Sequence, residues 1–140
     1  MIDILGGLQS TTAALNAERT RLDVISENIA NAYTTRGPDG KPYQRQVVVF
    51  EKAMQQALNG QTPTSGSQVA RIQKDNRAAQ MVYEPGHPDA NAQGMVALPN
   101  INIHEEMADL IAASRAFEAN LAVVKNSRSM ALSVLSIGKR

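Results

Sequence analysis

The chain has 140 residues, of which 43% are hydrophobic but only 4% aromatic, and it has no tryptophan. Aromatic side chains supply the largest single burials in a compact core, so a large globular core is disfavoured. The 14 Lys and Arg against 13 Asp and Glu leave a formal charge of +1, which gives no field directed at nucleic acid or anionic lipid. The lack of cysteine in the sequence excludes disulfides, zinc ribbons, thiol nucleophiles and iron–sulfur ligation.

No apolar run approaches the roughly 18–20 residues that a membrane-spanning helix needs, so we expect no direct membrane insertion. The first residues carry an acid at Asp3 and no basic side chain before Arg19. A secretory signal needs a basic start and a clean apolar stretch, and neither is present. We therefore expect the protein either to stay in the cytosol or to leave by a route that reads no cleavable signal.

The N-terminal part of the chain has a helical pattern over residues 8–31. Apolar side chains recur every seven residues, with one more at the companion spacing, and this places on one stripe Leu8, Leu15, Leu22, Ile25 and Ile29. Two polar residues, Thr11 and Glu18, interrupt the stripe. Because Gly6 and Gly7 weaken a helix, residues 1–7 are expected to be helical only when packed.

The middle of the chain, residues 32–100, holds all six prolines and most of the nine glycines. Enrichment in β-branched and apolar residues predicts short strands at 43–51, 69–74, 80–84 and 95–98, separated by turns. One or two helical turns are expected at 51–58. This segment is predicted to be a small, loop-rich unit that contains β-strands.

The C-terminal part has neither glycine nor proline from Asn102 to Ile137, which predicts a helix of some 35 residues, roughly 50 Å long. Asn102 is the expected N-cap, with Glu105 three residues later. Its apolar seam consists of Met107, Leu110, Ile111, Phe117, Leu121, Val124, Ala131, Leu132 and Leu135. A helix this long cannot wrap around a core of its own, and the N-terminal stripe is shorter. We therefore expect neighbouring subunits to cover part of the seam, with a plain intramolecular hairpin as the alternative.

The sequence offers no pattern for catalysis or metal binding. His87 and His104 lack the i,i+4 spacing of a helical metal site, and neither a serine nucleophile motif nor a phosphate-binding glycine loop occurs. The acids at Glu105, Glu106 and Asp109 are interpreted as a charged first turn that complements the helix dipole, in preference to a catalytic carboxylate pair. We expect no enzyme activity, cofactor, metal ion or small-molecule substrate.

Several segments resemble one family. Residues 26–34 read S-x-N-I-A-N-x-x-T, a signature near the N-terminus of bacterial flagellar rod and hook proteins. The likeness to a proximal-rod member continues in residues 40–50, 83–90, 98–102, 105–107 and 112–120. The positions that carry these motifs are Ser26, Asn28, Ile29, Ala30, Asn31, Thr34, Pro85, Gly86, Pro88, Asp89, Pro99 and Asn100. Met95 departs from the tyrosine that this family usually has there.

The resemblance implies a structural subunit of the flagellar rod, exported uncleaved through the flagellar type III apparatus. Such subunits assemble with copies of themselves and with other rod proteins into the drive shaft that crosses the periplasm, transmits torque and encloses the export channel. Basal-body ring and export-gate proteins would be partners at the proximal end. The resemblance implies that the terminal helices line the channel and that the middle segment makes lateral contacts.

The expected fold is mainly α. Long N- and C-terminal helices (1–31 and 101–140) form an antiparallel coiled-coil hairpin that packs laterally in a helical assembly, and residues 32–100 form the β-containing insertion. Two alternatives are a soluble helical-hairpin interaction module and an amphipathic module on a membrane surface, which would need Lys and Arg flanking its apolar face.

Overall fold

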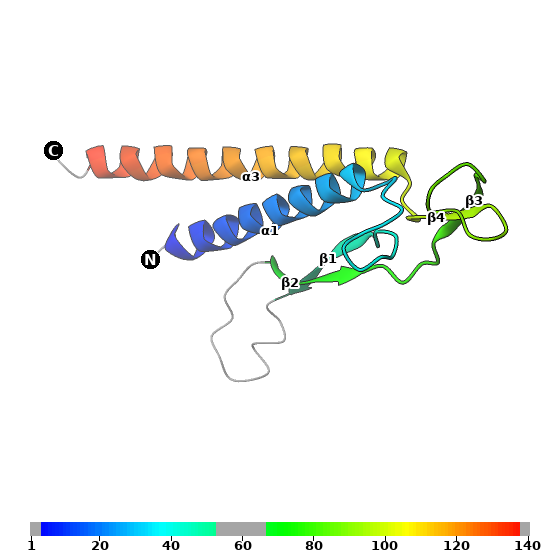
Figure 1. The fold of residues 1–140 in the computed structure, drawn as a ribbon. Coiled ribbons are helices and arrows are strands. Elements are labelled where there is room, and N and C mark those ends of the chain that lie inside the picture. Colours follow the sequence, from blue (N-terminus) through cyan, green and yellow to red (C-terminus); the bar gives the residue numbers. More distant parts are fainter. Residues whose placement is uncertain (1–3, 53–66, 138–140) are drawn as a thin grey trace, which may run out of the picture.

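The computed structural model describes residues 4–52 and 67–137 of the chain (Figure 1). Along these described residues the elements follow in the order α1 (Ile4–Ala30), β1 (Gln46–Lys52), β2 (Ser67–Lys74), β3 (Gln80–Tyr83), β4 (Met95–Leu98) and α3 (Ile103–Ile137). The predicted helices and strands are present, with ends shifted by a few residues. Helix α1 begins at Ile4 and continues through Gly6 and Gly7. Of the helical turns expected at 51–58, Glu51 and Lys52 belong to strand β1, and 53–58 lie outside the described residues.

Helices α1 and α3 lie side by side and run antiparallel (Figure 1). They are closest where α1 ends and α3 begins, and α3 continues beyond the start of α1 at the other end. The buried apolar residues of the pair are small or β-branched: Ala17, Val24, Ile25 and Ala113. Ala113 is fully buried, and a methyl side chain there lets the two helix backbones approach closely. Among the described residues, neither helix is long and apolar enough to cross a membrane.

The strands form two separate antiparallel pairs. Strand β1 pairs with β2, Gln46 opposite Lys74, with a bulge between Val49 and Phe50. Strand β3 pairs with β4, Gln80 opposite Leu98. Helix α1 contacts both strands of the first pair, whereas the second pair lies beyond the start of α3, at the right of Figure 1. The first strand pair is therefore the one that packs against α1.

Polar side chains cap the end of α1 and the start of α3, and these two helix ends meet at a junction. At the end of α1, Asn31 donates its side-chain amide to the Glu27 carbonyl at 2.9 Å, and Thr34 donates its hydroxyl to the Asn31 side-chain oxygen. At the start of α3, the Asn102 side-chain oxygen accepts the His104 backbone N–H at 3.1 Å, which confirms Asn102 as the N-cap. Both helix ends at the junction are thus capped by side chains.

Candidate functional site

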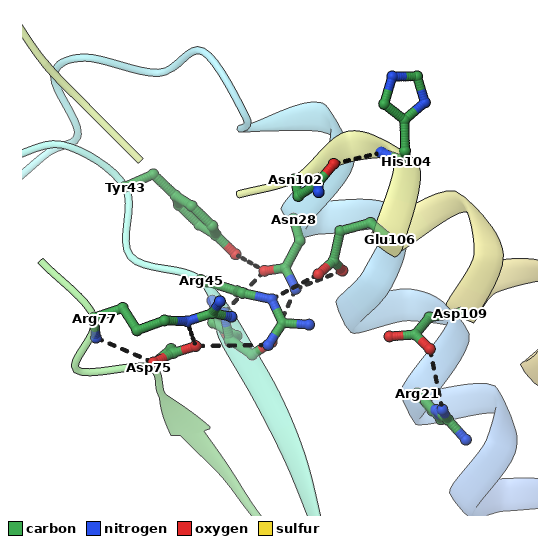
Figure 2. A network of polar contacts seen from close by, with 11 residues as sticks. Arg21, Asn28, Tyr43, Arg45, Asp75, Arg77, Asn102, His104, Glu106 and Asp109 are labelled. Atoms are coloured by element: carbon green, nitrogen blue, oxygen red, sulfur yellow. Dashed lines mark hydrogen bonds and ion pairs between the residues drawn. The ribbon is translucent and has the colours of Figure 1, made fainter. Parts of the chain in front are cut away.

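A network of polar side chains lies where the end of α1, the start of β1 and the start of α3 meet (Figure 2). We call it the corner cluster, and its members are Asn28, Tyr43, Arg45, Asp75, Arg77 and Glu106. These residues come from four separate segments of the chain. The cluster therefore connects parts that are distant in the sequence.

Asn28 is the centre of the cluster and is only 1% exposed. Its side-chain oxygen accepts the Gln46 backbone N–H at 2.9 Å and the Tyr43 hydroxyl at 3.1 Å. Its side-chain nitrogen donates to the Gln46 carbonyl at 2.8 Å and to Glu106 Oε2 at 3.1 Å. A carboxamide has two donor hydrogens and two acceptor lone pairs, so every one is used. Toward Gln46 the side chain of Asn28 acts as the backbone of a neighbouring strand would.

Glu106, also 1% exposed, supplies the buried charge of the cluster. Arg45 Nε donates to Glu106 Oε1 at 2.6 Å, and Arg45 Nη1 lies 3.6 Å from Asp75 Oδ2. Arg77 donates its Nε to Asp75 Oδ2 at 2.8 Å and its backbone N–H to Asp75 Oδ1 at 3.1 Å. Acids and bases thus alternate from the buried α3 carboxylate to the exposed end of the network, which is the pairing that a buried charge requires.

Glu105 and Glu106 do lie in the first turn of α3, but the first-turn interpretation does not account for the burial of Glu106. Glu105 is exposed at the surface, but Glu106 points into the corner cluster, as Figure 2 shows. Asp109, the third acid of that group, is partly exposed and lies 3.9 Å from Arg21 of α1. Glu105 and Glu106 look equivalent in the sequence. In the fold they differ, because only Glu106 lies beside Asn28 and Arg45.

The apolar residues predicted for the helix seams divide into two groups in the single chain. Ile25 is buried, and seven others are partly buried: Leu15, Leu22, Ile29, Leu110, Phe117, Val124 and Ala131. Met107, Leu121 and Leu132 are instead exposed, by 51%, 36% and 57%. Leu8 and Leu135 fall outside the residues whose side chains the structure describes.

Helix α3 carries more exposed apolar surface than the predicted seam. Ile111, also predicted for the seam, is 54% exposed and falls on the same side as Met107, Leu121 and Leu132. A second exposed stripe, confined to the distal half of the helix, consists of Val123, Met130, Val134 and Ile137. The distal half of α3 therefore presents apolar side chains on at least two sides that α1 does not cover.

Comparisons with known proteins match both ends of the chain. Residues 8–37 match the family described as "Flagella basal body rod protein", and residues 92–137 match "Flagellar basal body rod FlgEFG protein C-terminal". The flagellar basal-body rod protein FlgC of Borreliella burgdorferi is 40% identical, over 96% of this chain and 97% of its own. The FlgC proteins of Salmonella typhimurium (40%, over 91% and 92%) and Bacillus subtilis (36%, over 94% and 96%) are also similar.

The chain belongs to the FlgC family. The resemblance drawn from the sequence motifs is confirmed, and with it the expectation of a structural component of the flagellar basal-body rod rather than an enzyme. Within residues 4–52 and 67–137, no group of three His, Cys, Asp or Glu side chains could hold a metal ion.

The two matched regions of this FlgC-family chain contribute the buried members of the helix junction. Asn28 lies in the first region and Glu106 in the second, and their side chains meet at 3.1 Å. Ser26 and Ala30 are exposed on α1, and Ser26 donates its hydroxyl to the Leu22 carbonyl. Sequence reasoning named Asn28 as a motif position and missed its partners, because Glu106 is 78 residues away.

The other motif positions lie around the second strand pair. Pro85, Gly86 and Pro88 are exposed in the turn after β3, Pro99 is buried and Asn100 is exposed. Asp89 accepts a hydrogen bond from the Thr35 hydroxyl at 2.8 Å, and its Oδ1 lies 3.5 Å from Arg36 Nη1. These contacts connect the turn after β3 to the segment that follows α1. Among these motif positions, Asp89 thus makes a contact between segments 54 residues apart.

Hydrogen bonds, burial and charges in the cluster shift the pKa values of three members, Tyr43, Asp75 and Arg77, and that of Arg77 is raised by its hydrogen bond to Asp75. Hydrogen bonds from the Arg77 side chain and backbone hold the pKa of the Asp75 carboxyl below its ordinary value of 3.8. Burial, with the nearby Glu27 charge, raises the pKa of the Tyr43 hydroxyl above 10.0. The folded chain therefore favours ionised Asp75 and neutral Tyr43.

The Asp75 shift predicts a contribution to acid stability. Below pH 3.8 the unfolded chain binds more protons at this carboxyl than the folded chain does, so the contribution is complete above 3.8 and is lost as the pH falls through the lower folded value. Replacing Asp75 by Asn should flatten the fall of the urea unfolding midpoint in this acid range. Arg77→Ala should do the same, since Arg77 is the main cause of the shift. An unchanged slope in both variants would contradict the assignment.

Proposed function

We propose that this chain is a subunit of the proximal rod, which assembles helically with copies of itself and with other rod proteins into the shaft that transmits torque and encloses the export channel. Basal-body ring and export-gate proteins are the proposed partners at its proximal end. The subunit reaches its place, in the rod that crosses the periplasm, by export without a cleaved signal peptide.

The observation that carries the proposal is the exposed apolar surface of α3. Eight of its large apolar side chains are at least 36% exposed in the single chain, and four of them form the distal stripe. Contiguous apolar surface of this kind marks an interaction site, because burying it releases roughly 25 cal/mol per Å². Neighbouring subunits in a rod would cover it from more than one side.

The proposed organisation follows from the same surface. The helical segments 1–31 and 101–140 form a coiled-coil hairpin that packs laterally, and residues 32–100 make the remaining contacts between subunits. Leu15, Leu22, Ile25, Ile29, Leu110, Phe117 and Val124 are proposed to hold the hairpin together, with Leu8 and Leu135 extending it. Met107, Leu121 and Leu132 are proposed to contact neighbouring subunits.

The soluble hairpin module is the competing proposal, and the contact between α1 and α3 within one chain fits both proposals. A hairpin that works alone would leave the two exposed stripes of α3 in water. The number of sides on which α3 is apolar is therefore the feature that separates the two proposals, and it favours assembly.

The direct test is a density map of the intact basal body. We expect the chain in the proximal rod, with its helices nearly parallel to the rod axis and the stripe of Val123, Met130, Val134 and Ile137 against neighbouring subunits. Density that places the protein outside the rod, or that leaves this stripe facing solvent, would refute the proposal.

A further inference from the structure

The corner cluster joins three parts of the chain by contacts that need no second molecule. Asn28 lies near the end of α1, Arg45 directly precedes β1, and Glu106 lies in the first turn of α3. The side chains of Asn28 and Glu106 are each 1% exposed in the single chain, and Arg45 is 20% exposed. Rod assembly, which uses the exposed stripes, does not explain why a charge is buried here.

The geometry of the cluster restricts where the β1–β2 pair can lie. The Gln46 backbone N–H and C=O both bind the Asn28 side chain, at 2.9 and 2.8 Å. Strand β2 is connected through Asp75, whose backbone N–H donates to the Arg45 carbonyl at 2.7 Å. Hydrogen bonds weaken steeply once distance or angle departs from the optimum, whereas apolar side chains tolerate sliding. A shift of the strands by one residue would move Gln46 and Arg45 away, and the buried Asn28 amide and Glu106 carboxylate would keep only the 3.1 Å hydrogen bond between them.

The energetics of a buried ion pair indicate specificity more than stability. The cost of removing Glu106 and Arg45 from water offsets much of their attraction, so an apolar pair of similar size could serve stability as well. What an apolar pair could not supply is one defined position for the strands. Breaking the pair, by contrast, leaves a buried charge without its partner.

We infer that Asn28, Arg45 and Glu106 form a conformational lock that fixes the β1–β2 pair to the junction of α1 and α3 in the free subunit, before any neighbour binds. The lock orients the strands relative to α3, so the subunit enters an assembly with this corner already formed. The inference does not depend on rod assembly, because every contact in it lies within one chain.

The lack of cysteine in the sequence makes the test direct. Gln73→Cys on β2 and Ala108→Cys on α3 place two spin labels at exposed positions on either side of the lock. In dilute, unassembled subunit we expect one narrow distribution of label-to-label distances. Glu106→Ala and Asn28→Ala should lose that narrow distribution. Glu105→Ala is the matched control, since it removes the same side chain from the adjacent exposed position, and it should keep the narrow distribution.

A second readout separates loss of the lock from loss of the fold. Amide exchange at Val82 and Val96 reports the β3–β4 pair, which lies apart from the cluster, and protection there should persist in the lock variants. If Glu106→Ala loses this protection, Arg45→Lys decides, because it keeps the charge but loses the planar donor that reaches Glu106. A broad distribution in the unmodified subunit overturns the inference. A narrow distribution in both Glu106→Ala and Arg45→Lys also overturns it, and neither result bears on the rod proposal.

Discussion

Replacing Leu121 by Asp is expected to abolish rod formation while export of the subunit continues. Leu121 is 36% exposed in the single chain, so the free subunit tolerates a carboxylate there at little cost. Against a neighbouring helix the same carboxylate would be buried in apolar surroundings, which costs several kcal/mol unless it is neutralised or paired. A helical assembly repeats that cost at every copy of the subunit.

Motility of cells that carry the variant, with the secreted fraction blotted for the subunit, measures both parts of this prediction. Ser133→Asp is the matched control, because it adds the same charge at an exposed polar position of α3 that lies between the two apolar stripes, and swimming should persist. Leu22→Asp should also abolish swimming, but Leu22 is partly buried in the single chain and its loss would weaken the subunit too. Normal swimming with Leu121→Asp would exclude this side of α3 as an assembly surface and favour the soluble hairpin.

Much of the secondary structure could be predicted because its signals are local. The absence of glycine and proline after Asn102 predicted α3, and the run Val47–Phe50 predicted β1. Prolines and glycines marked the turns between the strands. The pairing of β1 with β2 and of β3 with β4 needed the structure, since short strands of similar composition pair in several ways.

The seam of α3 was predicted as one stripe, and the structure divides it. Leu110, Phe117 and Val124 recur every seven residues and are partly buried, whereas Leu121 and Leu132 are eleven residues apart and exposed. A step of seven residues turns the side chain by about 20° in one direction and a step of eleven by about 20° in the other, so the two series separate along the helix until Val124 and Leu132 point roughly 80° apart. A prediction from the sequence that accepts any repeated apolar spacing places both series in one seam.

The corner cluster was missed because its signals are not local. Asn28 and Arg45 lie 78 and 61 residues from Glu106. Nothing near Glu106 in the sequence distinguishes it from Glu105, and both acids suit the first turn of a helix. A charge at such a position is most often solvated, and only the fold shows that this one is buried.

The largest expected loss of stability follows from that difference. Glu106→Ala would leave the Asn28 amide without one acceptor and Arg45, 20% exposed, without its closest carboxylate. Breaking a buried pair by removing one partner costs about 3–5 kcal/mol, and Asp75, 3.6 Å from Arg45, places the expected loss at about 3 kcal/mol. Urea unfolding of the free subunit measures it.

The neighbouring acid supplies the reference for this measurement. Glu105→Ala loses the same favourable interaction with the start of the α3 dipole, about 0.3–1 kcal/mol, but it breaks no buried pair. The difference between the two variants therefore isolates the contribution of the cluster. Replacing Arg45 by Met and Glu106 by Leu together should cost less than Glu106→Ala alone, because no buried charge then lacks a partner. Equal losses in Glu105→Ala and Glu106→Ala would mean that the Glu106 carboxylate is solvated in the free subunit and that the corner forms only in the assembly.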